Sequence, residues 1–161
     1  MTETPEDYAR HNARMQRVQA ARERMQARRT LERGLLIVHT GNGKGKSSSA
    51  FGMAIRSLGW GMKVGIVQYV KGAWETGEKN FFQANPDLLT FEVMGEGFTW
   101  DTQDRARDIE AARAAWERSK ELILDPQYDF IILDELNIVL RQDTLPIDEI
   151  VAFLKTRPLT K

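Results

Sequence analysis

The sequence predicts an α/β fold with a mainly parallel sheet and helices on both of its faces. Apolar, strand-like runs alternate with helical segments along the 161 residues, as they do where helical crossovers join parallel strands. A glycine-rich turn follows the first of these runs. The last run is continuously apolar, as a strand covered on both faces must be, and the acidic pair Asp134-Glu135 ends it.

Strands are predicted where apolar runs lie between turn signals. Their expected ranges are Gly34 to Thr40, Met62 to Val70, Leu88 to Met94 and Tyr128 to Leu133. Because parallel strands carry their ligands at their carboxyl ends, we expect the glycine-rich turn and the acidic pair to share one edge of the sheet.

Helices are predicted in the segments around and between these strands. A long polar helix is expected over residues 6 to 32, which are rich in Ala, Arg, Gln and Glu and have little apolar face. Asp101 is expected to cap a helix that ends before Pro126 and buries Trp116 in the core. The remaining helices are expected at Ser48 to Leu58, at Lys79 to Ala84 and from Pro146 onward.

Composition predicts a globular protein with one folded domain, which an arginine-rich segment precedes. Hydrophobic residues make up 42% of the chain, Lys and Arg balance Asp and Glu, and Cys is absent, so cysteine nucleophiles and cysteine metal sites are excluded. We expect a basic helical segment over residues 1–33 and an α/β domain over 34–161. No apolar run approaches the roughly 20 residues that span a bilayer, and zero net charge gives no case for nucleic acid. The expected location is the cytoplasm, with no membrane partner.

The glycine-rich turn predicts a nucleotide triphosphate site. Glycines allow successive N–H groups to point into one concavity, and the following helix adds its positive end. The pattern expects a glycine where Thr40 stands, so the loop is a variant. A turn that binds nothing is the alternative. The residues expected to bind the nucleotide are Gly41, Asn42, Gly43, Lys44, Gly45, Lys46, Ser47 and Ser48, with Lys46 on the phosphates.

A magnesium site is predicted between the loop and the last strand. The Ser47 hydroxyl is expected to bind Mg²⁺, and Asp134 or Glu135 is expected to be the acidic partner at the end of its strand. Acidic residues also end strands as solvated caps, so the acidic pair alone is a weak sign of a metal site. Together with the glycine-rich loop it is a stronger one.

Several segments together resemble one family, the P-loop corrinoid adenosyltransferases. The resemblance runs from about Gly34 to Pro158 and includes the Thr40 variant of the loop. It implies a P-loop NTPase (RecA-like) architecture, with residues 34–161 as a nucleotide- and corrinoid-binding domain. Its segments are Thr40-Gly-Asn-Gly-Lys-Gly-Lys-Ser47, Val67-Gln-Tyr-Val-Lys-Gly72, Gly77-Glu78, Gly97-Phe-Thr-Trp100 and Leu133-Asp-Glu-Leu136.

The resemblance implies an enzyme that transfers the 5′-deoxyadenosyl group of ATP to the cobalt of cob(I)alamin or a precursor corrinoid and releases triphosphate. Cobalt is itself the nucleophile and carries no proton, so no protein base is required. His39 is expected to be structural. Lys46, Mg²⁺ and the loop amides would stabilise the leaving triphosphate. Gln68 and Lys71 belong to the implied binding site.

The resemblance also assigns a role to two aromatic residues. Phe98 and Trp100 would displace the lower axial base of cobalamin, which makes Co(II) easier to reduce; filling the core is their alternative role. The implied electron donor is a reduced flavodoxin-like protein or free reduced flavin, and the implied assembly is a homodimer. The arginine-rich N-terminal helix would attract an acidic donor or cap the corrin, or else is simply solvated.

The sequence departs from the family at its end. Family members continue past Arg157-Pro158 with further strands and a helix, whereas this chain stops at Lys161, so we expect the last strands of the sheet to be missing. The alternative functions are a generic RecA-like P-loop ATPase or kinase and a nucleotide-binding regulatory module. Adenosyl transfer and these two alternatives can be distinguished by the products that each forms. The preferred corrinoid and the acidic residue that contacts Mg²⁺ are left open.

Overall fold

The structure is a computed structural model that describes residues 4–70, 77–84, 86–94 and 104–160. It divides into two compact units, Met1–Arg33 and Gly34–Lys161. Within the described residues, no helix is long and apolar enough to cross a membrane.

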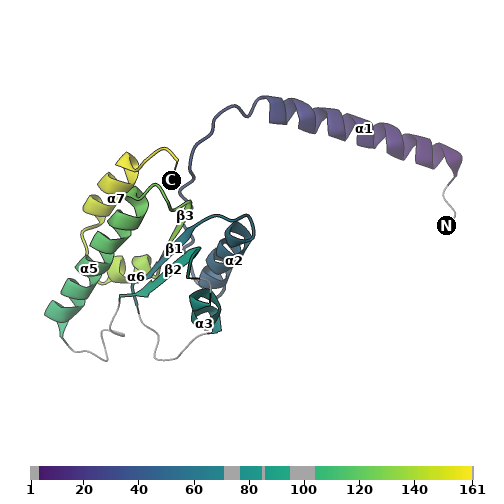
Figure 1. The fold of residues 1–161 in the computed structure, drawn as a ribbon. Coiled ribbons are helices and arrows are strands. Elements are labelled where there is room, and N and C mark those ends of the chain that lie inside the picture. The colour runs from purple at the N-terminus through teal and green to yellow at the C-terminus, as the bar shows by residue number, and fades with distance from the viewer. Residues whose placement is uncertain (1–3, 71–76, 85, 95–103, 161) are drawn as a thin grey trace. The chain divides into compact units, whose positions relative to one another are not determined.

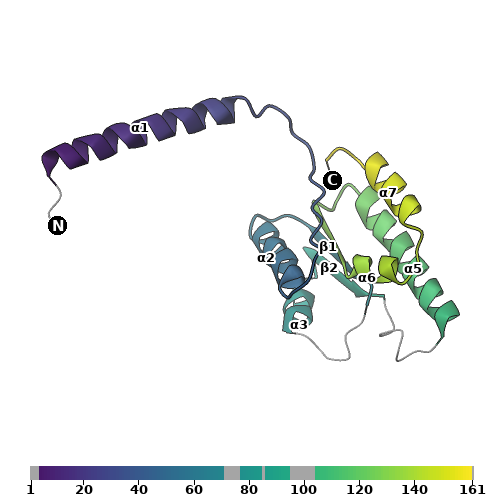
Figure 2. The same cartoon turned by 180° about the vertical axis from the view of Figure 1, so that it is seen from behind.

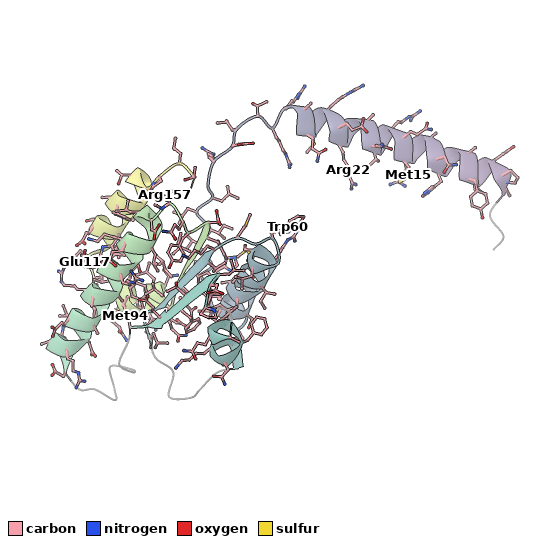
Figure 3. The ribbon with its side chains drawn as sticks, in the orientation of Figure 1. Met15, Arg22, Trp60, Met94, Glu117 and Arg157 are labelled. Atoms are coloured by element: carbon pink, nitrogen blue, oxygen red, sulfur yellow. The ribbon has the colours of Figure 1, made fainter. Side chains whose placement is uncertain are left out.

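The first unit is built around helix α1, Pro5–Ala27. Thr4 caps the helix: its hydroxyl accepts from the Asp7 N–H, and the Asp7 carboxylate accepts in return from the Thr4 N–H at 3.0 Å. None of the residues of α1 is buried, and Met15 and Arg22 project outward from it (Figure 3). The helix stops short of the predicted residue 32 because no packing supports it, and β-branched Thr30 is a weak helix former.

The second unit contains a three-stranded, fully parallel sheet, which confirms the predicted fold class. Strand β1 (Val64–Gln68) lies between β2 (Leu89–Val93) and β3 (Phe130–Asp134). Each strand lies within the range that the sequence predicts, apart from the one-residue extension of β3 to Asp134. The carboxyl ends of β1 and β3 coincide, since Gln68 is the register partner of Asp134.

Helices cover both faces of the sheet (Figures 1 and 2). Helices α2 (Lys46–Leu58) and α3 (Gly77–Gln83) lie on one face, and α5 (Arg105–Leu124), α6 (Leu136–Arg141) and α7 (Ile147–Thr156) lie on the other. Side chains of β1 alternate between the two cores. Val64 and Ile66 pack into the cluster that contains Phe51 of α2, and Val67 packs into the cluster of α5 to α7.

The predicted first strand, 34–40, is wrong in this structure. No strand is assigned there, and the exposed fractions are 76% for Leu35, 52% for Leu36, 51% for Ile37 and 65% for Val38. The backbone of Gly34 does donate to the Leu159 carbonyl, at 2.6 Å. An apolar run becomes a strand only where a neighbouring strand pairs with its backbone. In the described part of the chain the sheet ends at β2 on one side and at β3 on the other, and 34–40 pairs with neither.

On the α5 side of the sheet, one prediction needs correction and one helix had no prediction. Asp104 caps α5 in place of Asp101, which lies outside the described residues; the Asp104 carboxylate accepts from the N–H groups of Ala106 and Arg107. Helix α6 was not predicted, because it begins directly after the strand without a capping side chain. Trp116 is in the core as predicted, and its indole N–H donates to Glu149 of α7 at 2.9 Å.

Candidate functional site

The glycine-rich loop has the backbone geometry of an anion-binding concavity. Gly41, Gly43 and Gly45 have φ angles of +117°, +103° and +101°, and they alternate with Asn42 and Lys44, whose φ is negative. A Cβ added at any of the three glycines would meet no atom within 4 Å. Glycine is therefore favoured here by conformation rather than by lack of space, and the alternation turns neighbouring N–H groups toward one side.

The loop leads directly into the amino end of α2. Gly45 is the N-cap residue, so no side chain caps the helix, and its first turn contains no acidic residue. The first N–H groups of a helix have no partner within the helix, and the helix dipole makes this end positive. The loop and the helix end thus favour an anion at the same place.

Lys46, the first residue of α2, folds back over this loop. Its ammonium donates to the carbonyl of Gly41 at 3.0 Å and to the carbonyl of Gly43. These bonds hold a full positive charge beside the loop, where a bound phosphate would meet it. The side chain is not part of the hydrophobic core.

Asp134 connects the loop to the sheet. The carboxylate is buried, with 8% of the residue exposed. Its Oδ1 accepts from the Ser47 hydroxyl at 2.9 Å, and its Oδ2 accepts from the Gln68 side-chain amide at 3.0 Å. The structure therefore brings together residues from the loop helix and from two neighbouring strands at the edge where the sequence predicts a site.

Glu135 follows Asp134 in a left-handed conformation, with φ of +63°. Burial raises the pKa of its carboxyl, and the neighbouring charge of Asp134 raises it further; Lys46 and Arg141 act in the opposite direction. A non-glycine residue with positive φ stores strain, which is often found at functional sites. The conformation turns the chain from β3 directly into α6.

The predicted site residues have different positions. Gly41, Gly43, Gly45, Lys46, Ser47, Gln68, Asp134 and Glu135 lie in or beside the arrangement above. Asn42, Lys44 and Ser48 are exposed on the loop and at the start of α2, as the three loop glycines also are. Lys71, Phe98 and Trp100 lie outside the described residues. His39 is exposed in the segment that lacks the predicted strand, so it is not packed as expected.

Two features of the site were missed by the sequence reasoning. One is the bond from Gln68 to Asp134. The sequence could have indicated it, because both residues lie at the carboxyl ends of strands that were predicted to be parallel. The other is Arg141, whose charge acts on Glu135 from α6, and no spacing rule places these two residues together.

The groups at the site are suited to phosphate and a hard cation. The Ser47 hydroxyl and the Asp134 carboxylate offer oxygen ligands, and the loop and Lys46 offer positive charge. Within the ranges that the structure describes, no three His, Cys, Asp or Glu side chains gather as a metal cage. One or two carboxylates completed by phosphate oxygens are typical of Mg²⁺ bound with a nucleotide.

Comparison with known proteins places most of the chain in one group. Residues 32–161 match the family described as ATP:corrinoid adenosyltransferase BtuR/CobO/CobP. A corrinoid adenosyltransferase of Pseudomonas aeruginosa is 52% identical over 158 residues, covering 98% of this chain and 78% of that protein. Those of Sinorhizobium sp and Escherichia coli K12 are 49% and 45% identical, each over 92% of this chain and over 70% and 75% of their own lengths.

Proposed function

The chain belongs to the ATP:corrinoid adenosyltransferase family, and we propose that it transfers the 5′-deoxyadenosyl group of ATP to the cobalt of a reduced corrinoid. The electron pair of Co(I) forms the bond to C5′ of the ribose. The C5′–O bond breaks, and triphosphate leaves with its electron pair. The observation that carries the proposal is the family match over residues 32–161, together with an anion-binding loop beside a buried aspartate.

This reaction asks the chain to position ATP and to stabilise the leaving charge. Loop N–H groups and the amino end of α2 would bind the triphosphate, and the Lys46 ammonium would neutralise part of its charge. No group needs to remove a proton from the nucleophile. This suits a site whose described side chains are a lysine, a serine, an amide and two carboxylates.

Mg²⁺ fits the donor set at this site. The Ser47 hydroxyl and the Asp134 carboxylate are hard oxygen ligands 2.9 Å apart, so both can face one small cation. When bound, Mg²⁺ would neutralise phosphate oxygens and so make triphosphate a better leaving group. We assign its binding to Ser47 and Asp134, with Glu135 as a further carboxylate.

Further assignments rest on the sequence alone. Phe98 and Trp100 would remove the lower axial ligand of the corrinoid, and Lys71 would take part in substrate binding. The electron would come from a reduced flavodoxin-like protein or from free reduced flavin. We place the enzyme in the cytoplasm, where ATP is available, as a homodimer.

One assay tests the activity without the physiological donor. The protein is mixed with ATP, Mg²⁺ and chemically reduced cobalamin, while the corrin absorbance is followed and the phosphate products are separated. We expect adenosylcobalamin and triphosphate in equal amounts. Release of ADP and phosphate without a corrin change would instead identify an ATPase, and no turnover would identify a nucleotide-binding module.

A further inference from the structure

Gln68 holds one oxygen of a carboxylate whose other oxygen faces the glycine-rich loop. Its side-chain amide donates to Oδ2 of Asp134 at 3.0 Å, while the Ser47 hydroxyl donates to Oδ1 at 2.9 Å. A carboxylate oxygen accepts, so the NH₂ end of the amide must be the end that faces it. The carboxylate is thereby held at both oxygens and cannot rotate without breaking one bond.

The sheet supports this contact independently of the loop. Gln68 and Asp134 are register partners on neighbouring parallel strands, and the Tyr69 N–H donates to the Asp134 carbonyl at 3.0 Å. Backbone pairing thus fixes the place from which Gln68 reaches Asp134. The other partner, Ser47, belongs to α2 and follows the glycine-rich loop.

The chemistry of the amide suits a supporting role. A lysine at this position would neutralise the carboxylate that a cation requires, and a glutamate would repel it. A neutral amide donates a hydrogen bond and leaves the negative charge available.

From these contacts we infer that Gln68 is a positioning residue, which orients the Asp134 carboxylate so that Oδ1 is presented, beside the Ser47 hydroxyl, to the Mg²⁺ that accompanies ATP. This inference rests on the proposed function, since it assumes that the site binds ATP with Mg²⁺. Gln68 itself contacts neither the metal nor the nucleotide in this role.

The test is the effect of Mg²⁺ on ATP affinity, measured by calorimetry without corrinoid. In the wild-type protein we expect Mg²⁺ to tighten ATP binding relative to binding in EDTA. Gln68→Met keeps an unbranched side chain of similar length but removes the donor. Outer-shell hydrogen bonds typically change metal affinity by about 10- to 100-fold, so we expect ATP binding with Mg²⁺ to weaken by that factor while binding in EDTA is unchanged.

A matched variant controls for the loss of any glutamine. Gln127→Met removes an amide that accepts from Lys63 at 3.1 Å before the start of β3, at the opposite end of the strand from Asp134. It should change neither affinity. Mn²⁺ titration followed by electron paramagnetic resonance, in the presence of ATP, should show the same loss for Gln68→Met and none for Gln127→Met.

Three results would overturn the inference: an unchanged Mg²⁺ effect in Gln68→Met, equal weakening with and without Mg²⁺, and a wild-type ATP affinity that does not respond to Mg²⁺. Equal weakening accompanied by a lower melting temperature would show that Gln68 is only structural. Failure of the proposed function is distinguishable, because it would leave these binding results intact while no adenosylcorrinoid forms in the wild-type protein.

Discussion

Strand β3 and the segment 34–40 each place an apolar run directly before a part of the site. Strand β3 pairs with β1 and leads to Asp134, whereas 34–40 forms no strand and leads to the glycine-rich loop. The carboxylate side of the site is therefore built on the sheet. The phosphate side is attached to the rest of the unit mainly through α2. The difference teaches that residues proposed to bind the substrate need not lie on the most tightly packed part of the fold.

The largest expected effect is a loss of activity when a residue beside the glycine-rich loop is changed. Lys46→Ala should lower the rate of adenosyl transfer by roughly 30- to 1000-fold, because removing a charge-stabilising group from a reacting site typically has effects of this size. The melting temperature should stay unchanged, since Lys46 bonds to loop carbonyls that water can reach. Single-turnover kinetics and thermal unfolding measure the two quantities.

Lys155→Ala, which removes an exposed lysine of α7, is the control and should behave as wild type. Full activity in Lys46→Ala would remove the loop from the mechanism.

A matched pair of isoleucines tests the structural contrast directly. Ile132 of β3 is 7% exposed and Ile37 is 51% exposed. Ile132→Ala should lower the free energy of unfolding by about 2–4 kcal/mol, because it leaves a cavity in the core. Ile37→Ala should change the free energy of unfolding by less than about 0.5 kcal/mol, as surface substitutions usually do. Urea denaturation checks both, and a similar loss in the two variants would show that 34–40 is packed in solution.

A pair of glycines extends the contrast to β1 and α2. A Cβ at Gly65 would lie 3.2 Å from Leu122 and 3.3 Å from Tyr128, whereas one at Gly52 would meet nothing within 4 Å. Gly65→Ala should destabilise the protein by about 1–2 kcal/mol through overpacking. Gly52→Ala should stabilise it by about 0.5–1 kcal/mol through helix propensity. Opposite shifts in the urea midpoint are expected, and two shifts of the same sign would contradict this account.

The smallest expected effect concerns a hydroxyl just before β3. The Tyr128 hydroxyl is 2.7 Å from the Thr90 hydroxyl of β2, and Tyr128→Phe should lower the free energy of unfolding by about 1 kcal/mol. Tyr8→Phe, on a side chain of α1 that is 56% exposed, should have no effect. If thermal unfolding shows the two variants to be equal, the bond between the hydroxyls contributes nothing to stability.

The sequence predicted strands β1, β2 and β3 and the proximity of Ser47 to the acidic pair Asp134-Glu135, because apolar runs and turn signals are local features. It left open which of the two acidic residues Ser47 meets, and the structure gives the bond to Asp134. Sequence reasoning failed where secondary structure depends on contacts with other segments of the chain. The run at 34–40 has the composition of a strand, but composition does not say whether a neighbouring strand is present. The short helix α6 was missed because its N-cap residue, Glu135, is in a left-handed conformation and supplies no capping side-chain bond that would signal a helix start.

The fine structure of the site was also beyond the sequence. The resemblance placed Gln68 among the binding residues, but its contact with Asp134 emerges only once β1 and β3 are in register. The pKa of Glu135 also depends on the folded chain: burial raises it, the charge of the adjacent Asp134 raises it further, and Lys46 and Arg141 act in the opposite direction.

The exposed run at Leu35, Leu36, Ile37 and Val38 has a consequence for the behaviour of this protein at high concentration. All four residues are apolar, Ile37 and Val38 are β-branched, and the run contains no charge and no proline, a composition that favours stacking between molecules into fibrils. Arg33 before the run and Lys44 after it supply flanking charges that oppose such stacking. Because salt screens charge repulsion, aggregation of this chain should increase as protein concentration and ionic strength rise together.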